Sequence, residues 1–130
     1  MAYLVSYDGS LVLVQFSGTL TREDLERVGD EVIAIERGGA NTPHRLTDFR
    51  QITDIAVGYA EMSALAERSR ARPLGAHIRS ALVVGQPVQM GFARMFQILN
   101  EHPQVTVRIF EDETSARAWI ATGLPNENGG

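Results

Sequence analysis

The stretch from Ile78 to Gly123 constrains the fold more than any other part of this chain. It contains two apolar, strand-like runs, Ile78–Val84 and Val105–Phe110. Each run is followed almost at once by a segment with apolar residues at helical spacing, Val88–Glu101 and then Asp112–Thr122. Strands that alternate with short helices are typical of α/β domains in which neighbouring strands run parallel. We therefore expect two strand–helix units here, with both strands in one sheet.

The first part of the chain predicts an antiparallel hairpin followed by further alternation. Tyr3–Tyr7 and Leu11–Ser17 flank Asp8-Gly9, a pair of residues that tolerates the positive φ angles of a tight hairpin turn. Thr21 is a suitable N-cap for a helix that ends at Gly38-Gly39. The remaining expected elements are a strand at Arg45–Phe49, a loop at Arg50–Val57 and a helix at Gly58–Ala71.

Together these elements predict an α/β domain with a mixed five-stranded sheet and four helices, in the order ββαβαβαβα. The N-terminal hairpin is expected to be antiparallel and the rest of the sheet largely parallel. A chain of 130 residues is long enough to bury one core, and we expect a single domain over residues 1–123. Residues 124–130 are polar and end in two glycines, so we expect them to form a disordered tail.

Charge and composition argue against several classes of function. The formal net charge is −4, whereas a nucleic-acid partner would require a clustered positive surface, so we expect no such partner. The chain has no cysteine, which excludes disulfides and thiolate metal sites. No apolar run approaches the roughly 20 residues of a membrane span. Residues 1–10 lack the basic start of a signal peptide, so the expected location is the cytoplasm.

Signals of catalysis are weak. His44, His77 and His102 are too scattered for a metal site, and the chain has no phosphate-loop, dinucleotide-binding or serine-nucleophile motif. Asp48 and Asp54, near the end of the third expected strand, could form a pair of catalytic carboxylates. An acidic residue at the end of a strand more often caps a helix or forms a hydrogen bond within a loop. We therefore expect no enzyme activity, no metal and no cofactor.

The third expected helix has two apolar faces. One face is expected in the core, and it comprises Val88, Phe92, Met95, Phe96 and Leu99. Met90, Arg94 and Ile98 follow at intervals of four on the opposite face. Either a neighbouring part of the chain covers this second face, or it is a surface for a protein partner, where Met and Arg are enriched. We expect a homodimer formed through the helix at residues 88–101.

Five short segments together resemble one known family. They are Gly91-Phe92-Ala93-Arg94-Met95-Phe96, Val107-Arg108-Ile109-Phe110-Glu111-Asp112, residues 116–120, residues 16–21 and Asp48-Phe49-Arg50. This combination resembles the SpoIIAA-like proteins, which are small bacterial domains related to the STAS domains of anti-sigma-factor antagonists. The resemblance extends over residues 3–121. It implies the SpoIIAA/STAS-like fold and a regulatory protein that docks on a partner kinase.

The resemblance also implies a phosphorylation switch, from which this chain departs. STAS-type antagonists are phosphorylated on a serine in an Asp-Ser-x-Gly-like turn that opens the helix after the third strand. The matching stretch here is Asp54-Ile55-Ala56-Val57-Gly58, so Ile55 stands in the position of the acceptor serine. Thr53 is the nearest hydroxyl, and it precedes the acid. Because isoleucine cannot form a phosphate ester, we expect no serine switch at this place.

The leading hypothesis is a non-enzymatic regulatory or protein-interaction module. The alternative is a carrier of a small apolar or anionic ligand, because the fold is also similar to that of lipid-carrying domains. In open α/β sheets, ligands bind beyond the carboxyl ends of the strands, an edge formed here by Arg50–Gly58 and Gly85–Gly91. The candidate residues for a ligand or a partner are Asp48, Arg50, Thr53, Asp54, Gly85, Met90, Arg94 and Ile98.

Overall fold

A computed structural model describes the chain apart from residues 1–2, 8–10, 39–42, 71–76, 100–101 and 123–130. The strands are β1 (Tyr3–Tyr7), β2 (Leu11–Leu20), β3 (His44–Ile55), β4 (Ile78–Val83) and β5 (Val105–Phe110). The helices are α1 (Arg22–Gly38), α2 (Tyr59–Arg70), α3 (Pro87–Leu99) and α4 (Glu113–Ala121). The expected turn at Asp8-Gly9, the expected helix ends at Gly39, Ala71 and Glu101, and the expected tail lie outside the described residues.

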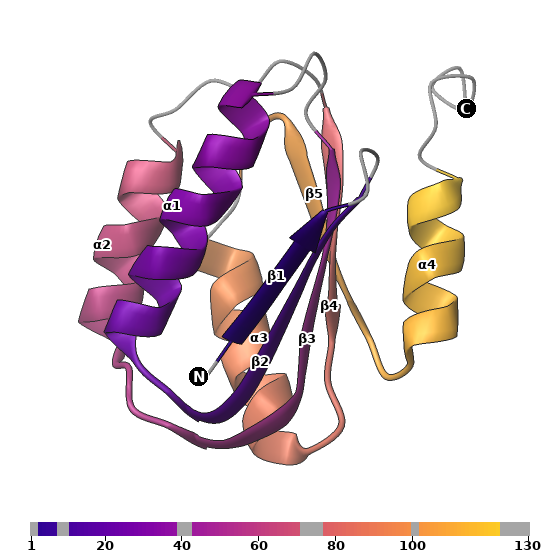
Figure 1. Cartoon of the computed structure of the whole chain (residues 1–130). Coiled ribbons are helices and arrows are strands. Elements are labelled where there is room, and N and C mark those ends of the chain that lie inside the picture. Colours follow the sequence, from indigo (N-terminus) through magenta and orange to yellow (C-terminus); the bar gives the residue numbers. More distant parts are fainter. Residues whose placement is uncertain (1–2, 8–10, 39–42, 71–76, 100–101, 123–130) are drawn as a thin grey trace.

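The five strands form one mixed sheet in sequential order, β1-β2-β3-β4-β5. β1 pairs antiparallel with β2, and each later pair of neighbours is parallel. Helices α1, α2 and α3 cover one face of the sheet, while α4 lies alone on the opposite face (Figure 1). The predicted order ββαβαβαβα, the antiparallel start and the parallel remainder are therefore confirmed.

The larger core lies between the sheet and the three helices on its first face. Phe49 of β3 is at its centre and is fully buried. Its ring meets Phe92 of α3 edge-on at 5.5 Å between centroids, and the ring of Phe16 from β2 lies 5.9 Å away. Such tilted and T-shaped contacts are the favoured geometries of aromatic pairs. A smaller core joins β3 and β4 to α4 through Leu46, Ala81, Val83, Ala116 and Ile120.

The start of α1 follows the capping pattern that the sequence indicated. The Asp24 amide donates to Thr21 Oγ1 at 3.2 Å, and the Thr21 amide donates to Asp24 Oδ2 at the same distance. This reciprocal arrangement satisfies two backbone donors at a helix end that have no partner within the helix. Thr21 therefore fixes the point at which the chain leaves β2 and enters α1.

Strand β3 is longer than the sequence predicted. The expected end at Phe49 and the expected loop from Arg50 to Val57 are wrong, because the strand continues to Ile55. Its second half remains extended because β2 also continues beyond the expected end at Ser17 and pairs with it as far as Leu20. β4 accompanies β3 only as far as Asp48. The second half of β3 thus has one partner strand and several exposed polar side chains, a pattern that is typical of a loop.

The pairing of β2 with the second half of β3 is irregular. The register shifts between Gln15 and Ser17 and again between Gly18 and Thr19, as at β-bulges. Gly18 has a φ of 70°, which is a left-handed conformation that residues with a Cβ rarely adopt. Glycine at this position therefore lets β2 continue through the second shift to Leu20.

Beyond the end of β4, a single buried side chain makes hydrogen bonds to the backbone of β3. Gln89, which is only 1% exposed, donates from Nε2 to the carbonyl oxygens of Arg50 and Ile52 at 3.2 and 2.8 Å. Its Oε1 accepts from the amides of Gly85 and Gln86 at 2.7 and 3.0 Å. The side chain thereby joins the second half of β3 to the segment that leads into α3, and it satisfies four backbone groups.

The buried face of α3 differs from the expected one at its first turn. Val88, expected in the core, is 54% exposed, because the helix begins at Pro87 and Gln89 occupies the buried position of this turn. Phe92 and Leu99 are buried as expected, and Met95 and Phe96 pack partly against the same core. Met90, expected on the outer face, is half-buried against this core as well.

We predict that Gln89→Met lowers the free energy of unfolding by about 1–3 kcal/mol, because methionine has a similar size but leaves buried backbone groups without partners. Urea unfolding followed by circular dichroism measures this loss. Gln97→Met is the matched control, since Gln97 is half-buried on the same helix and makes one hydrogen bond, to the Val107 carbonyl at 2.9 Å. Equal losses in the two variants would contradict the special role of Gln89.

Candidate functional site

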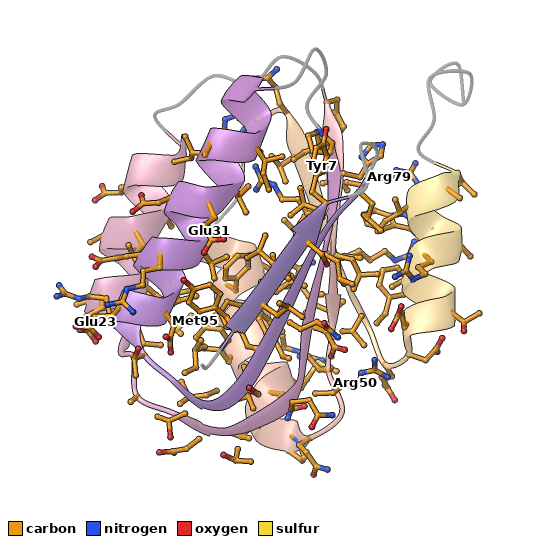
Figure 2. All side chains as sticks on the ribbon, viewed as in Figure 1. Tyr7, Glu23, Glu31, Arg50, Arg79 and Met95 are labelled. Carbon is orange, nitrogen blue, oxygen red and sulfur yellow. The ribbon has the colours of Figure 1, made fainter. Side chains whose placement is uncertain are left out.

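Asp48 and Arg50 form a closed pair on β3. Figure 2 shows Arg50 on the side of the sheet that carries α4. The Arg50 guanidinium donates from Nε to Asp48 Oδ1 at 3.0 Å and from Nη2 to Oδ2 at 2.8 Å. The Arg50 amide adds a third bond to Oδ1 at 2.9 Å. Asp48 is therefore not half of the catalytic carboxylate pair that the sequence left as a possibility; it is buried and bonded by Arg50.

The surroundings of Asp48 act on its pKa in opposite directions. Burial favours the neutral acid, but the hydrogen bonds and the positive charge of Arg50 favour the carboxylate more strongly, so that the pKa of Asp48 lies below its ordinary value. A general base near neutral pH would require a raised pKa. Asp48 is thus suited to holding Arg50 and not to transferring a proton.

A second carboxylate reaches Arg50 from the start of α4. Glu113 Oε1 lies 3.4 Å from Arg50 Nη2, and the preceding residue, Asp112, caps the helix by accepting from the Ser115 amide at 2.6 Å. The backbone and side-chain hydrogen bonds from Ser115 lower the pKa of Asp112. Arg50 therefore faces an acidic helix end, and an anionic ligand at this edge would have to compete with the chain's own carboxylates.

The opposite end of α4 is also tied to the sheet. Arg79 of β4 donates from Nη1 to the Trp119 carbonyl at 2.6 Å and to the Thr122 hydroxyl at 2.7 Å. Its guanidinium carbon lies 4.9 Å from the centroid of the Trp119 ring. Figure 2 shows Arg50 and Arg79 at the two ends of this helix. One arginine at each end thus holds α4 against its face of the sheet.

The structure separates the remaining strand-end candidates. Thr53 and Asp54 are exposed in the second half of β3. The residues that pair with Asp48 and Asp54 on β2, Gln15 and Thr19, are four residues apart, which corresponds to about 13 Å at the usual rise per residue. The two carboxylates are too far apart to act on one bond. Gly85 adjoins Arg50, but its amide already donates to Gln89 and is not free to bind a ligand.

The outer face of α3 forms a shallow groove with the edge strand β5. It is lined by Met90, Arg94, Gln97, Ile98, Ile109 and Glu111, and we refer to these six residues as the α3–β5 groove. Ile98 is 67% exposed, and Arg94 is exposed beside it. The structure thus brings together the three helix residues that the sequence singled out and adds Ile109 and Glu111, which sequence spacing on the helix could not indicate.

The three histidines lie apart, and each ring has a hydrogen-bond partner. The His44 ring accepts from the Arg79 amide at 2.9 Å, and the His102 ring accepts from the Gln104 amide at 2.9 Å. His77 is within 2.8 Å of the Thr106 hydroxyl. Within the described ranges, His, Asp and Glu side chains do not gather in threes as a metal site would require. None of the described helices has the length and apolar character needed to cross a membrane.

Comparisons with known proteins agree with this geometry. A family model described as SpoIIAA-like matches residues 11–121. The chain belongs to the SpoIIAA-like family. No curated protein matches the sequence at a significant level. The family assignment confirms the resemblance that the sequence motifs indicated.

Two solved structures share the SpoIIAA-like fold. One is an uncharacterized protein from Shewanella loihica with a SpoIIAA-like fold, at 17% identity and a TM-score of 0.60, with 92% of each chain covered. The other is an anti-sigma factor antagonist from Mycobacterium paratuberculosis, at 14% identity and a TM-score of 0.61, again with 92% of each chain covered. At these identities the likeness establishes the fold of this SpoIIAA-like chain.

We predict that Asp48→Asn destabilises the protein by about 1–2 kcal/mol at neutral pH, because one charge-assisted pair is lost while the partly exposed Arg50 limits its strength. The folded-state pKa of Asp48 lies below the ordinary value of 3.8, so the carboxylate contributes stability above pH 3.8. That contribution is lost as the pH falls through the folded-state pKa. The difference between wild type and variant should therefore shrink in acid.

Urea unfolding at a series of pH values measures this difference. Asp54→Asn is the control, because Asp54 is exposed on the same strand, and its effect should remain within about 0.5 kcal/mol. If the difference in unfolding free energy between the wild type and Asp48→Asn stayed constant down to the lowest pH, the lowered pKa of Asp48 would be contradicted.

Proposed function

We propose that this SpoIIAA-like chain is a non-enzymatic regulatory module that works by docking on another protein. The proposal rests on the contrast between the carboxyl ends of the strands and the α3–β5 groove. At the carboxyl ends of the strands, Asp48, Arg50 and Gln89 are engaged with one another or with the backbone. In the α3–β5 groove, Ile98 and Arg94 remain exposed. Of these two regions, the α3–β5 groove is therefore the one whose groups are available to a partner.

A second copy of the chain is the partner that we propose for the α3–β5 groove. The groove carries Arg94 and Glu111, one charge of each sign, so a twofold contact can place the arginine of one copy against the glutamate of the other. Ile98 lies beside both and would lose its solvent contact. β5 is an edge strand of the described sheet, so the adjoining surface is not covered by another strand.

We predict that wild-type protein dimerises and that Ile98→Asp shifts it to monomer with unchanged circular dichroism. Burial of each isoleucine contributes about 1.5–3 kcal/mol, and the substitution replaces it by a charge that would require desolvation. Sedimentation velocity over a range of protein concentrations measures the change. Val88→Asp is the control, because Val88 is an exposed apolar residue of the same helix outside the groove.

Two results would contradict self-association through this groove. One is a wild-type protein that remains monomeric at the highest concentration. The other is a dimer that Val88→Asp disrupts as strongly as Ile98→Asp.

We also propose that serine phosphorylation at the start of α2 does not regulate this module. Ile55, in the acceptor position, is the last residue of β3 and packs partly against the larger core. Thr53 is exposed on the strand, not on the turn that opens α2.

We predict no stoichiometric phosphate addition at residues 53–58 after incubation with a STAS-directed kinase and ATP. Intact-mass measurement followed by peptide mapping tests this. A full equivalent of phosphate on Thr53 would overturn the proposal, and Thr53→Ala, which should then remain unmodified, identifies the site.

The alternative of an anionic-ligand carrier at the strand ends has less support. Arg50 is the cation at that edge that the sequence singled out, and Asp48 and Glu113 both contact it. The net charge of −4 likewise gives no support to a nucleic-acid partner. The cytoplasmic location and the absence of a cofactor stay predictions.

A further inference from the structure

A cavity of about 290 Å³ lies between α1, α2 and the face of the sheet that these helices cover. Most of its lining is apolar and comes from β2, α1, α2 and α3, including Phe16, Val28, Val32, Met62, Ala66 and Phe96. Protein cores are close-packed, and voids much larger than a water molecule are few. Apolar cavities of about 150 Å³ stay dry and bind molecules such as benzene, so this cavity has room for a larger guest.

One end of the cavity is polar. Arg45 and Ser80 of neighbouring strands line it, together with Thr47. The Arg45 guanidinium pairs through Nη2 with Glu36, whose side chain is 6% exposed. Arg45 Nε is shielded from solvent and has no hydrogen-bond partner among the described residues. A buried donor without an acceptor is unfavourable, so a guest that brings an oxygen to this end, with a small rotation of the guanidinium, would relieve that cost.

The charges around the cavity disfavour an anionic guest. Glu26 and Asp30 of α1 line it, and Glu36 already neutralises Arg45. Asp30 is exposed and Glu26 is partly exposed, so both acids lie on the solvent side of the cavity, where they would repel an entering carboxylate or phosphate. A neutral molecule avoids that repulsion and can still accept from Arg45.

A glycine in the middle of α1 enlarges the cavity. Gly29 lines it, and a Cβ built on this residue meets no atom within 4 Å. Glycine within a helix is less favourable than other residues because of its backbone entropy. Neither crowding nor a positive φ requires glycine here. Glycine at this position therefore lowers the stability of the helix, and the absence of a side chain leaves the cavity open.

We propose that this cavity binds a neutral, largely apolar molecule that carries one hydrogen-bond-accepting oxygen, with its apolar part between α1 and α2 and its oxygen at Arg45. The site differs from the strand-end edge expected from the sequence. It also stands independently of the docking surface on α3, because Met90, Arg94 and Ile98 do not line it.

The fluorescent dye N-phenyl-1-naphthylamine, which is neutral and apolar, serves as the probe of the cavity. We expect saturable, one-to-one binding to the wild-type protein and displacement by the neutral ketone nonan-2-one. Nonanoate, of the same chain length but negatively charged, should displace the dye at least about tenfold more weakly. Arg45→Lys keeps a positive charge for Glu36 but lacks the Nε–H donor. It should therefore weaken the binding of the ketone more than the binding of the dye.

Gly29→Leu should fill the cavity and lower dye affinity by at least about tenfold, while its thermal midpoint stays equal to or above that of the wild type. Gly91→Leu is the matched control, since Gly91 is also a helical glycine with open space around it but lies on α3 outside the cavity. The proposal is overturned if the wild type shows no saturable binding of the dye or if Gly29→Leu binds the dye as tightly as the wild type does. It is also overturned if Gly91→Leu loses as much dye affinity as Gly29→Leu. Equal displacement by nonanoate and nonan-2-one overturns the assigned ligand class.

Discussion

The hydrogen bonds of Gln89 are the constraint on which the rest of this structure depends, because they join segments that regular secondary structure leaves unconnected. β4 stops pairing with β3 at Asp48, yet β3 continues for seven more residues, from 49 to 55. On that stretch the Gln89 amide donates to two strand carbonyls, and its oxygen accepts from two amides that precede α3. An amide group supplies both donors and an acceptor, which is the set required here. The second half of β3 thus has β2 on one side and Gln89 on the other, and α3 lies where its Phe92 meets Phe49.

This arrangement decides where function can lie in the molecule. Ligands of open α/β sheets commonly bind at the carboxyl ends of the strands, where amides and charged groups are available. Here the amides near Gly85 are bonded to Gln89, and Arg50 is bonded to Asp48 and approached by Glu113. The polar groups of that edge therefore hold the sheet, α3 and α4 together. In the part of the chain that the structure describes, the α3–β5 groove and the mainly apolar cavity beside α1 are the two places where we propose binding.

The sequence predicted the order of elements and the family because both depend on local patterns, such as the apolar runs of β4 and β5 and the Thr21 cap of α1. It missed the second half of β3, because exposed polar residues and one partner strand are typical of a loop. It also missed Gln89, since a polar residue in a helical pattern is ordinarily assigned to the solvent side, and Val88 was placed in the core instead. The pairing of Asp48 with Arg50 follows from their spacing on one strand face and could have been found. The cavity could not have been predicted, because it depends on the distance between two helices. The glycine at position 29, within the expected helix, is the sequence feature related to it.

Native-state amide hydrogen exchange at Gly85 and Gln86 tests the role of Gln89 most directly. These two amides precede α3, where backbone donors ordinarily have no partner within the helix and exchange quickly. If their bonds to Gln89 hold β3 and α3 together, both amides should be protected nearly as strongly as the amides of the buried strand β4, and should open only with global unfolding. Exchange of Gly85 and Gln86 at the rate of solvent-exposed amides would contradict the account.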